Sequence, residues 1–75
     1  MKEKVISVFA NTFGKQPGDI PDSLSQKDFA AWDSLQHLNL MVALEEAFGV
    51  EFEPDEIVEI SSIQDILSVL KNKGV

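Results

Sequence analysis

Residue types that build several common classes of site are missing from this sequence or nearly so. The 75 residues include no cysteine, which excludes a disulfide framework and a thiolate metal site. The single histidine, His37, excludes the usual histidine-rich zinc sites. No apolar run approaches the ~18 residues of a membrane span, and residues 1–15 lack the continuous apolar run of a signal peptide. We therefore expect a cytoplasmic protein without a membrane span.

Positive charge is scarce and unevenly placed. Thirteen acids outnumber six lysines, the net charge is −7, and no lysine lies between Asp28 and Leu70. That stretch holds ten acids, namely Asp28, Asp33, Glu45, Glu46, Glu51, Glu53, Asp55, Glu56, Glu59 and Asp65. A negative surface of this kind repels nucleic acid and anionic lipid and speeds encounter with basic proteins. We expect no nucleic-acid partner, although charge alone fits a merely soluble acidic domain equally well.

Glycine is also scarce, and with the short chain this argues against an enzyme. Ser34 and His37 are three residues apart and would share a helix face, with Asp33 beside them. A hydrolase would also need oxyanion donors and a dry pocket. No stretch is glycine-rich enough to build that donor loop, and the chain is too small to enclose a substrate. The sequence therefore predicts a non-enzyme, with His37 as an exposed polar residue in a first helical turn.

The acidic residues Asp55, Glu56 and Glu59 do not predict a metal site. They lack the ligand spacing and the central glycine of a calcium loop. A solvated acidic helix start, favoured by the helix dipole, explains them.

Apolar residues recur at helical spacing along the whole chain, and no convincing alternating strand is present. Main helices are predicted over residues 2–13, 34–48 and 61–74, with a short helix over 54–59. Residues 16–32 form a long connection containing one short turn from Ser25. The sequence thus predicts an all-α fold, a small four-helix bundle with a long loop between helices 1 and 2, as a single domain over residues 1–75.

Capping signals support these helix bounds. Gly14 and Gly49 stand where a glycine ends a helix. Asp33 and Gln36 have capping-box spacing at the second main helix, and Ser61 and Gln64 have it at the last.

Ser34 begins the second main helix after the long connection, so its hydroxyl is expected to be exposed and fixed in position. A phosphate ester there would meet the positive end of the helix dipole and unpaired backbone N–H groups. The alternative is that Ser34 is only a helix cap, worth about 1 kcal/mol.

A family resemblance favours the interpretation of Ser34 as the site of a phosphate ester over that of a helix cap alone. AspSerLeu at 33–35 is followed by the apolar helix LeuAsnLeuMetValAlaLeuGluGluAlaPheGly, and IleSerSerIleGln opens the last helix. With the length, helix order and acidity, this resembles the acyl carrier protein family over nearly the whole chain. The resemblance implies that Ser34, between Asp33 and Leu35, carries a covalent 4′-phosphopantetheine arm. A phosphopantetheinyl transferase would add the arm from coenzyme A, and its thiol would hold acyl groups as thioesters.

The resemblance also implies surfaces for partners and cargo. The acidic second helix would dock onto basic patches of acyl ligases, transferases or synthases through Leu38, Val42, Glu45 and Glu46. The inner positions Leu40, Leu44, Phe52 and Ile60 would line a pocket for the acyl chain, or else form ordinary core. A monomer is expected.

Two positions depart from the family pattern. The residue before AspSerLeu is usually small, and here it is Trp32, which would contact a partner, shield the arm or fold over the end of the bundle. Gln36, His37 and Asn39 leave the start of the docking helix uncharged. Weaker acidic contacts favour a dedicated set of partners, and so a specialised stand-alone carrier. Its pathway would be fatty-acid, polyketide or another specialised biosynthesis, and the alternative function is an unmodified acidic adaptor that binds a basic protein.

Overall fold

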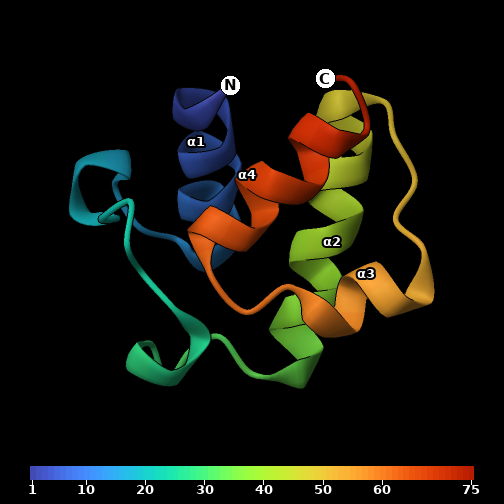
Figure 1. Ribbon diagram of the computed structural model, residues 1–75. Helices are drawn as coiled ribbons and strands as arrows, with labels where there is room; N and C mark the ends of the chain where they lie inside the picture. The colour runs from blue at the N-terminus through green and yellow to red at the C-terminus, as the bar shows by residue number, and fades with distance from the viewer.

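Four α-helices follow one another along the chain in the computed structural model, which describes all residues 1–75 (Figure 1). They are α1 (Lys2–Phe13), α2 (Ser34–Phe48), α3 (Pro54–Glu59) and α4 (Ile63–Asn72). Two short 3₁₀ turns, η1 (Pro17–Asp19) and η2 (Gln26–Asp28), interrupt the connection between α1 and α2. There is no strand beyond one isolated antiparallel pairing of Ser25 with Ser62. The all-α, four-helix prediction is confirmed, while η1 is a second short turn in the connection, where only the turn from Ser25 was predicted.

The ends of α1 and α2 lie at the capping residues that the sequence predicts. Gly14 and Gly49 both have φ of 66°, the left-handed conformation that glycine adopts without strain, and they end α1 and α2. Asp33 Oδ1 accepts the Gln36 backbone N–H at 2.9 Å and so caps α2 as predicted. The Gln36 side chain does not complete a capping box, because its Oε1 accepts from Asn39 instead.

The predicted start of the last helix is wrong by one residue. Ser62, not Ser61, is the cap of α4, and its Oγ accepts the Asp65 backbone N–H at 3.0 Å. Ser61 stays outside the helix because its carbonyl accepts the Gln26 N–H at 2.7 Å, while Ile63 N–H donates to the Leu24 carbonyl. The long connection is thereby fastened to the start of α4.

One apolar core joins the helices, with α1 packed against both α2 and α4. It contains thirteen buried residues: Val5, Phe9, Ala10, Ile20, Trp32, Leu40, Met41, Leu44, Phe52, Ile60, Ile63, Ile66 and Leu70. Both termini lie at one end of the molecule and the start of α2 lies at the other (Figure 1). No helix is both long enough and apolar enough to cross a bilayer.

The short helix α3 is held by polar contacts as well as by the core. Lys73 Nζ pairs with Glu56 Oε1 at 2.8 Å, which ties α3 to the end of α4. Glu45 Oε2 accepts the Phe52 N–H at 2.8 Å, which ties the segment before α3 to α2. A third contact, from His37, reaches the backbone of α3 itself.

Candidate functional site

Ser34 is the first residue of α2 and is exposed. Because Asp33 makes the cap, the Ser34 hydroxyl is not needed for capping, and it has no hydrogen-bond partner in the chain. The interpretation of Ser34 as only a helix cap is therefore wrong. A short side chain on a rigid helix start presents a free hydroxyl to solvent.

The backbone around Ser34 suits an anion. The N–H groups of Ser34 and Leu35 lie in the first turn of α2 and have no acceptor within the chain. Free donors and the helix dipole together stabilise a nearby exposed anion by about 0.3–1 kcal/mol. No basic side chain lies in the first turn of α2, so these backbone groups are what the site offers to a phosphodiester on Ser34 Oγ.

Trp32 is buried, with only 2% of its surface exposed, so the alternative in which it contacts a docking partner is wrong. Its ring packs edge-on against Phe9, with centroids 5.0 Å apart, in a cluster that includes Phe13 and Phe29. Of the three alternatives offered by the sequence, the structure shows the fold over the end of the bundle. Burial of this large ring anchors the connection two residues before Ser34.

His37 is also buried, at 9% exposure, so the expectation of an exposed polar residue is wrong. Trp32 Nε1 donates to His37 Nδ1 at 2.8 Å, and His37 Nε2 lies 2.7 Å from the Ile57 carbonyl oxygen. Both ring nitrogens are thus used inside the fold, and the imidazole turns away from any role as a base for Ser34. The spacing from His37 to Leu40, Met41 and Leu44 could have shown this burial, because it continues the inward stripe of α2.

Comparison with known proteins places these observations in a family. Residues 3–70 match the family model described as the phosphopantetheine attachment site. The chain belongs to the acyl carrier protein family. It is 36% identical to the acyl carrier protein of Thermosynechococcus vestitus, over 95% of this chain and 88% of that one. The acyl carrier proteins of Nitratidesulfovibrio vulgaris (31% identity, 97% and 96% covered) and Syntrophobacter fumaroxidans (35%, 99% and 93%) are also similar.

Membership identifies the cofactor as covalent 4′-phosphopantetheine, derived from coenzyme A. The residues around Ser34 fit such a group, because the serine offers a free hydroxyl and the helix start offers free N–H donors. The chain brings no group of three or more acidic, histidine or cysteine side chains together as metal ligands.

The outer face of α2 carries the apolar residues expected for docking in an acyl carrier protein. Leu38 and Val42 are 54% and 53% exposed, and Leu35 at the helix start is exposed on the same side. Glu46 is exposed, whereas Glu45 is half-buried and its carboxylate accepts the Phe52 N–H. The predicted docking residues of α2 therefore share a face, with Glu45 partly engaged inside the molecule.

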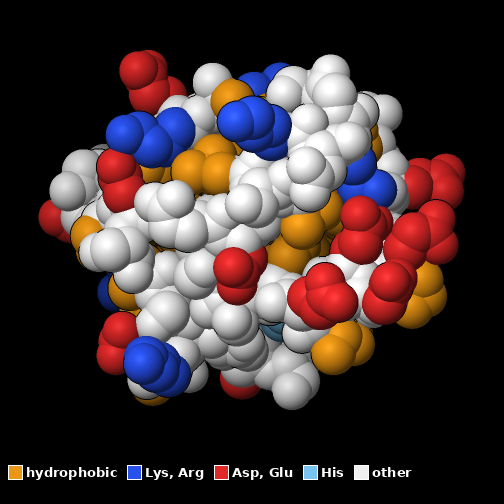
Figure 2. Space-filling model, viewed as in Figure 1, with side chains coloured by type: hydrophobic (Ala, Val, Ile, Leu, Met, Phe, Trp, Pro, Cys, Tyr) orange, Lys and Arg blue, Asp and Glu red, His pale blue; other side chains and the backbone are white.

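The most exposed of the large apolar residues was not predicted from the sequence. Val58 on α3 is 83% exposed. Ile57 and Ile60 have the i, i+3 spacing of an inward pair, and Val58 falls outside that stripe, so the helical pattern could have singled it out. Figure 2 shows orange side chains beside a gathering of red acidic ones at this side of the molecule.

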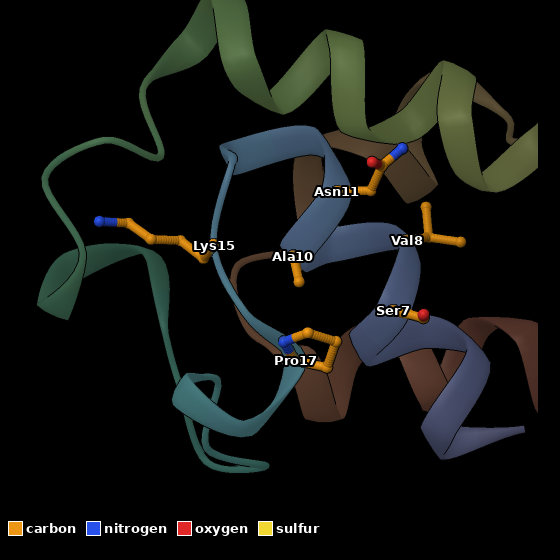
Figure 3. A pocket seen from close by; sticks show the side chains of 6 residues that line it. All are labelled: Ser7, Val8, Ala10, Asn11, Lys15 and Pro17. Atoms are coloured by element: carbon orange, nitrogen blue, oxygen red, sulfur yellow. The ribbon is translucent and has the colours of Figure 1, made fainter.

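The four inner positions expected to line an acyl pocket belong to the closed core. Leu40, Leu44, Phe52 and Ile60 are all buried within the single apolar cluster. The one hollow of the surface lies elsewhere, an open depression of about 380 Å³ on the outer side of α1. Figure 3 shows its lining residues, Ser7, Val8, Ala10, Asn11, Lys15 and Pro17, on α1 and the turn after it.

Two ion pairs shift pKa values in the molecule. The Lys73 ammonium, and then the Glu53 backbone N–H, hold the pKa of Glu56 below its ordinary value. At the other end of the chain, the hydrogen bond and charge of Asp22 raise the pKa of Lys2. The two ion pairs occupy only Asp22 and Glu56 among the acids, so most of the negative surface remains open to a partner.

Proposed function

We propose that this chain is an acyl carrier whose 4′-phosphopantetheine arm is attached through Ser34 Oγ. The observation that carries the proposal is the exposed, unbonded hydroxyl of Ser34 at the first position of α2, with capping left to Asp33. Attachment forms an Oγ–phosphorus bond and breaks the phosphoanhydride bond of coenzyme A. The hydroxyl proton and adenosine 3′,5′-bisphosphate are released, and a phosphodiester anion remains on the serine. The free N–H groups of Ser34 and Leu35 would stabilise that anion.

The residues of the chain hold and present the group and perform no bond chemistry on the cargo. When attached, the arm supplies a terminal thiol that holds an acyl or aminoacyl group as a thioester. The chain has no cysteine, so no side-chain thiol competes for that group. His37, the one side chain suited to general base catalysis near neutral pH, has both nitrogens engaged. We therefore infer a carrier and not an enzyme, acting as a monomeric single domain in the cytoplasm.

The outer face of α2 is the proposed docking surface for a phosphopantetheinyl transferase and for acyl ligases, transferases or synthases. Leu38 and Val42 supply apolar area, and Glu46, with the partly engaged Glu45, supplies charge toward basic patches. Burial removes Trp32 from this surface. Cargo sequestration would need Leu40, Leu44, Phe52 and Ile60 to separate, since they are packed together here.

The partners are proposed to be those of a specialised biosynthetic pathway. Gln36 and Asn39 leave the first half of the docking helix without charge, and the burial of His37 does not change that. Fewer acidic contacts select among basic partners more narrowly. The proposal fails if the chain replaces the carrier of a generic fatty-acid synthase as well as that system's own carrier does.

Intact mass after incubation with coenzyme A and a broad-specificity phosphopantetheinyl transferase tests the attachment directly. The parent chain should gain one phosphopantetheine, and Ser34→Ala should gain none while keeping its helical circular dichroism. If the folded parent gains no mass with several transferases, the unmodified acidic adaptor becomes the better interpretation. A gain by Ser34→Ala would place the arm on another residue.

A further inference from the structure

Two buried polar side chains flank Ser34 and take no part in the proposed attachment. Trp32 lies two residues before the serine, and His37 lies three residues after it. The indole and the imidazole are hydrogen-bonded to each other, and the imidazole also reaches the carbonyl of Ile57 on α3. We call this arrangement the Trp32–His37–Ile57 chain.

The partners of His37 determine where its hydrogen lies. An indole N–H can only donate and a carbonyl oxygen can only accept. His37 Nδ1 therefore accepts from Trp32, and Nε2 carries the hydrogen and donates to Ile57. A ring protonated on both nitrogens would direct an N–H at the indole N–H. The arrangement thus requires neutral His37 in one tautomer, which is a property that can be observed.

The Trp32–His37–Ile57 chain joins three segments of the fold. Trp32 ends the long connection, His37 lies in the first turns of α2, and Ile57 lies on α3. The backbone of Trp32 is also fixed, because its N–H donates to the Phe29 carbonyl and its own carbonyl accepts from Gln26 Nε2 at 3.0 Å. Ser34 is thus exposed between two residues that are both anchored in the interior.

We propose that Trp32 and His37 are positioning residues for the modification of Ser34. The inference rests on the proposed function, in which Ser34 is the attachment residue. Their hydrogen bond holds the end of a long connection against α2, so the serine is already ordered when the transferase arrives. Without the bond, that segment must be ordered on binding, which weakens binding of the carrier. The effect is expected in KM for the carrier, with kcat nearly unchanged. The segment before Ser34 must be ordered both in the bound substrate and in the transition state, so the cost of ordering it is the same in both.

Transferase kinetics on three variants test this proposal. Trp32→Phe keeps a ring against Phe9 but removes the N–H, and His37→Leu removes both ring nitrogens while leaving apolar bulk. Each should lower kcat/KM by about five- to tenfold, as expected for loss of one buried hydrogen bond, mostly through KM. The double variant should be no worse than the poorer single variant, because either change already breaks the shared bond.

The controls separate positioning from general stability. Val5→Ala removes buried apolar volume from the first turn of α1, at the end of the molecule opposite the start of α2, and should lower stability by at least a comparable amount. Its transferase kinetics should match the parent's. Nitrogen chemical shifts of the parent imidazole should report the Nε2–H tautomer, and the indole N–H should exchange slowly with solvent.

The outcomes are decisive. Unchanged kcat/KM in both single variants overturns the proposal, and so does an equal fall in Val5→Ala, additive losses in the double variant or the opposite tautomer in the parent. If one variant loses its helical circular dichroism, the other still decides. An unmodified parent would instead refute the attachment at Ser34, so the two failures are distinguishable.

Discussion

At the scale of the residue, Asp33 and Ser34 have different roles at the start of α2. The carboxylate accepts the Gln36 N–H, which leaves the neighbouring hydroxyl free. A serine at the cap position would have to use its oxygen for the helix and would lose that bond on esterification. Moving the cap one residue upstream resolves the conflict, which is why AspSer works here as a pair.

Asp33→Ala should lower the free energy of unfolding by about 1 kcal/mol, because the Gln36 N–H loses its acceptor. Asp33→Asn is the matched control, since asparagine caps about as well as aspartate and removes the same charge. Urea denaturation of the three proteins measures the difference. If asparagine were as damaging as alanine, charge and not the hydrogen bond would be what Asp33 contributes.

At this scale, some features of the site could be predicted from the sequence and others could not. The free hydroxyl of Ser34 and the cap at Asp33 follow from residues that are neighbours in sequence, and both could be predicted. The burial of His37 depends on an indole five residues away and on a carbonyl twenty residues away. The spacing of His37 with Leu40 and Leu44 indicates that it faces inward. A polar ring can enter the core only when such partners satisfy it, however, and no residue near His37 in the sequence predicts the Ile57 carbonyl.

At the scale of the element, apolar periodicity and capping residues predicted the helices. Tertiary contacts determined the exact start of α4 and which side chains of α2 are buried. Ser61 and Ser62 both stand three residues before a residue able to complete a cap, and the pairing of Ser61 with Gln26 selects Ser62. On α2, the family resemblance predicted that Leu40 and Leu44 face inward and that Leu38 faces outward. The structure buries Leu40 and Leu44 and leaves Leu38 outside, a choice fixed by the packing of α1.

The short helix α3 should respond to acid through its ion pair with α4. The pKa of Glu56 is lowered in the folded state, chiefly by its bond with Lys73, so the carboxylate stabilises the fold while it is charged. This contribution is fully present above the ordinary value of 4.5 and disappears as pH falls through the lower folded value. The free energy of unfolding of the parent should thus exceed that of Glu56→Gln near neutral pH and converge with it in acid.

A matched background isolates the ion pair in that experiment. In Lys73→Met the main cause of the lowered Glu56 pKa is absent, so the further change Glu56→Gln should make a smaller difference near neutral pH. Urea denaturation over a pH series measures all four proteins. A parent–variant difference that stays constant into acid would show that the carboxylate acts through packing and not through its charge.

At the scale of the whole molecule, the apolar core and the surface charge have different roles. A small domain has little stability to spare, and here thirteen buried apolar residues join α1, α2 and α4, with Ile57 of α3 packed against them. Only two of the thirteen acidic residues form ion pairs within the molecule. The fold is thus stabilised by its apolar core, and a net charge of −7 remains to attract basic partners over distances longer than any contact.

Docking to the phosphopantetheinyl transferase should therefore weaken as salt rises, because surface charges are screened over ~8 Å at physiological ionic strength. Glu46→Gln, on the outer face of α2, should weaken docking and flatten its salt dependence, since one charge of the interface is gone. Asp19→Asn is the control, because it removes the same charge from the exposed turn η1, away from that face. Titration calorimetry at several salt concentrations would measure each dissociation constant. Affinity that stays constant with salt would assign recognition to the apolar residues Leu38 and Val42, whose contribution does not depend on screening.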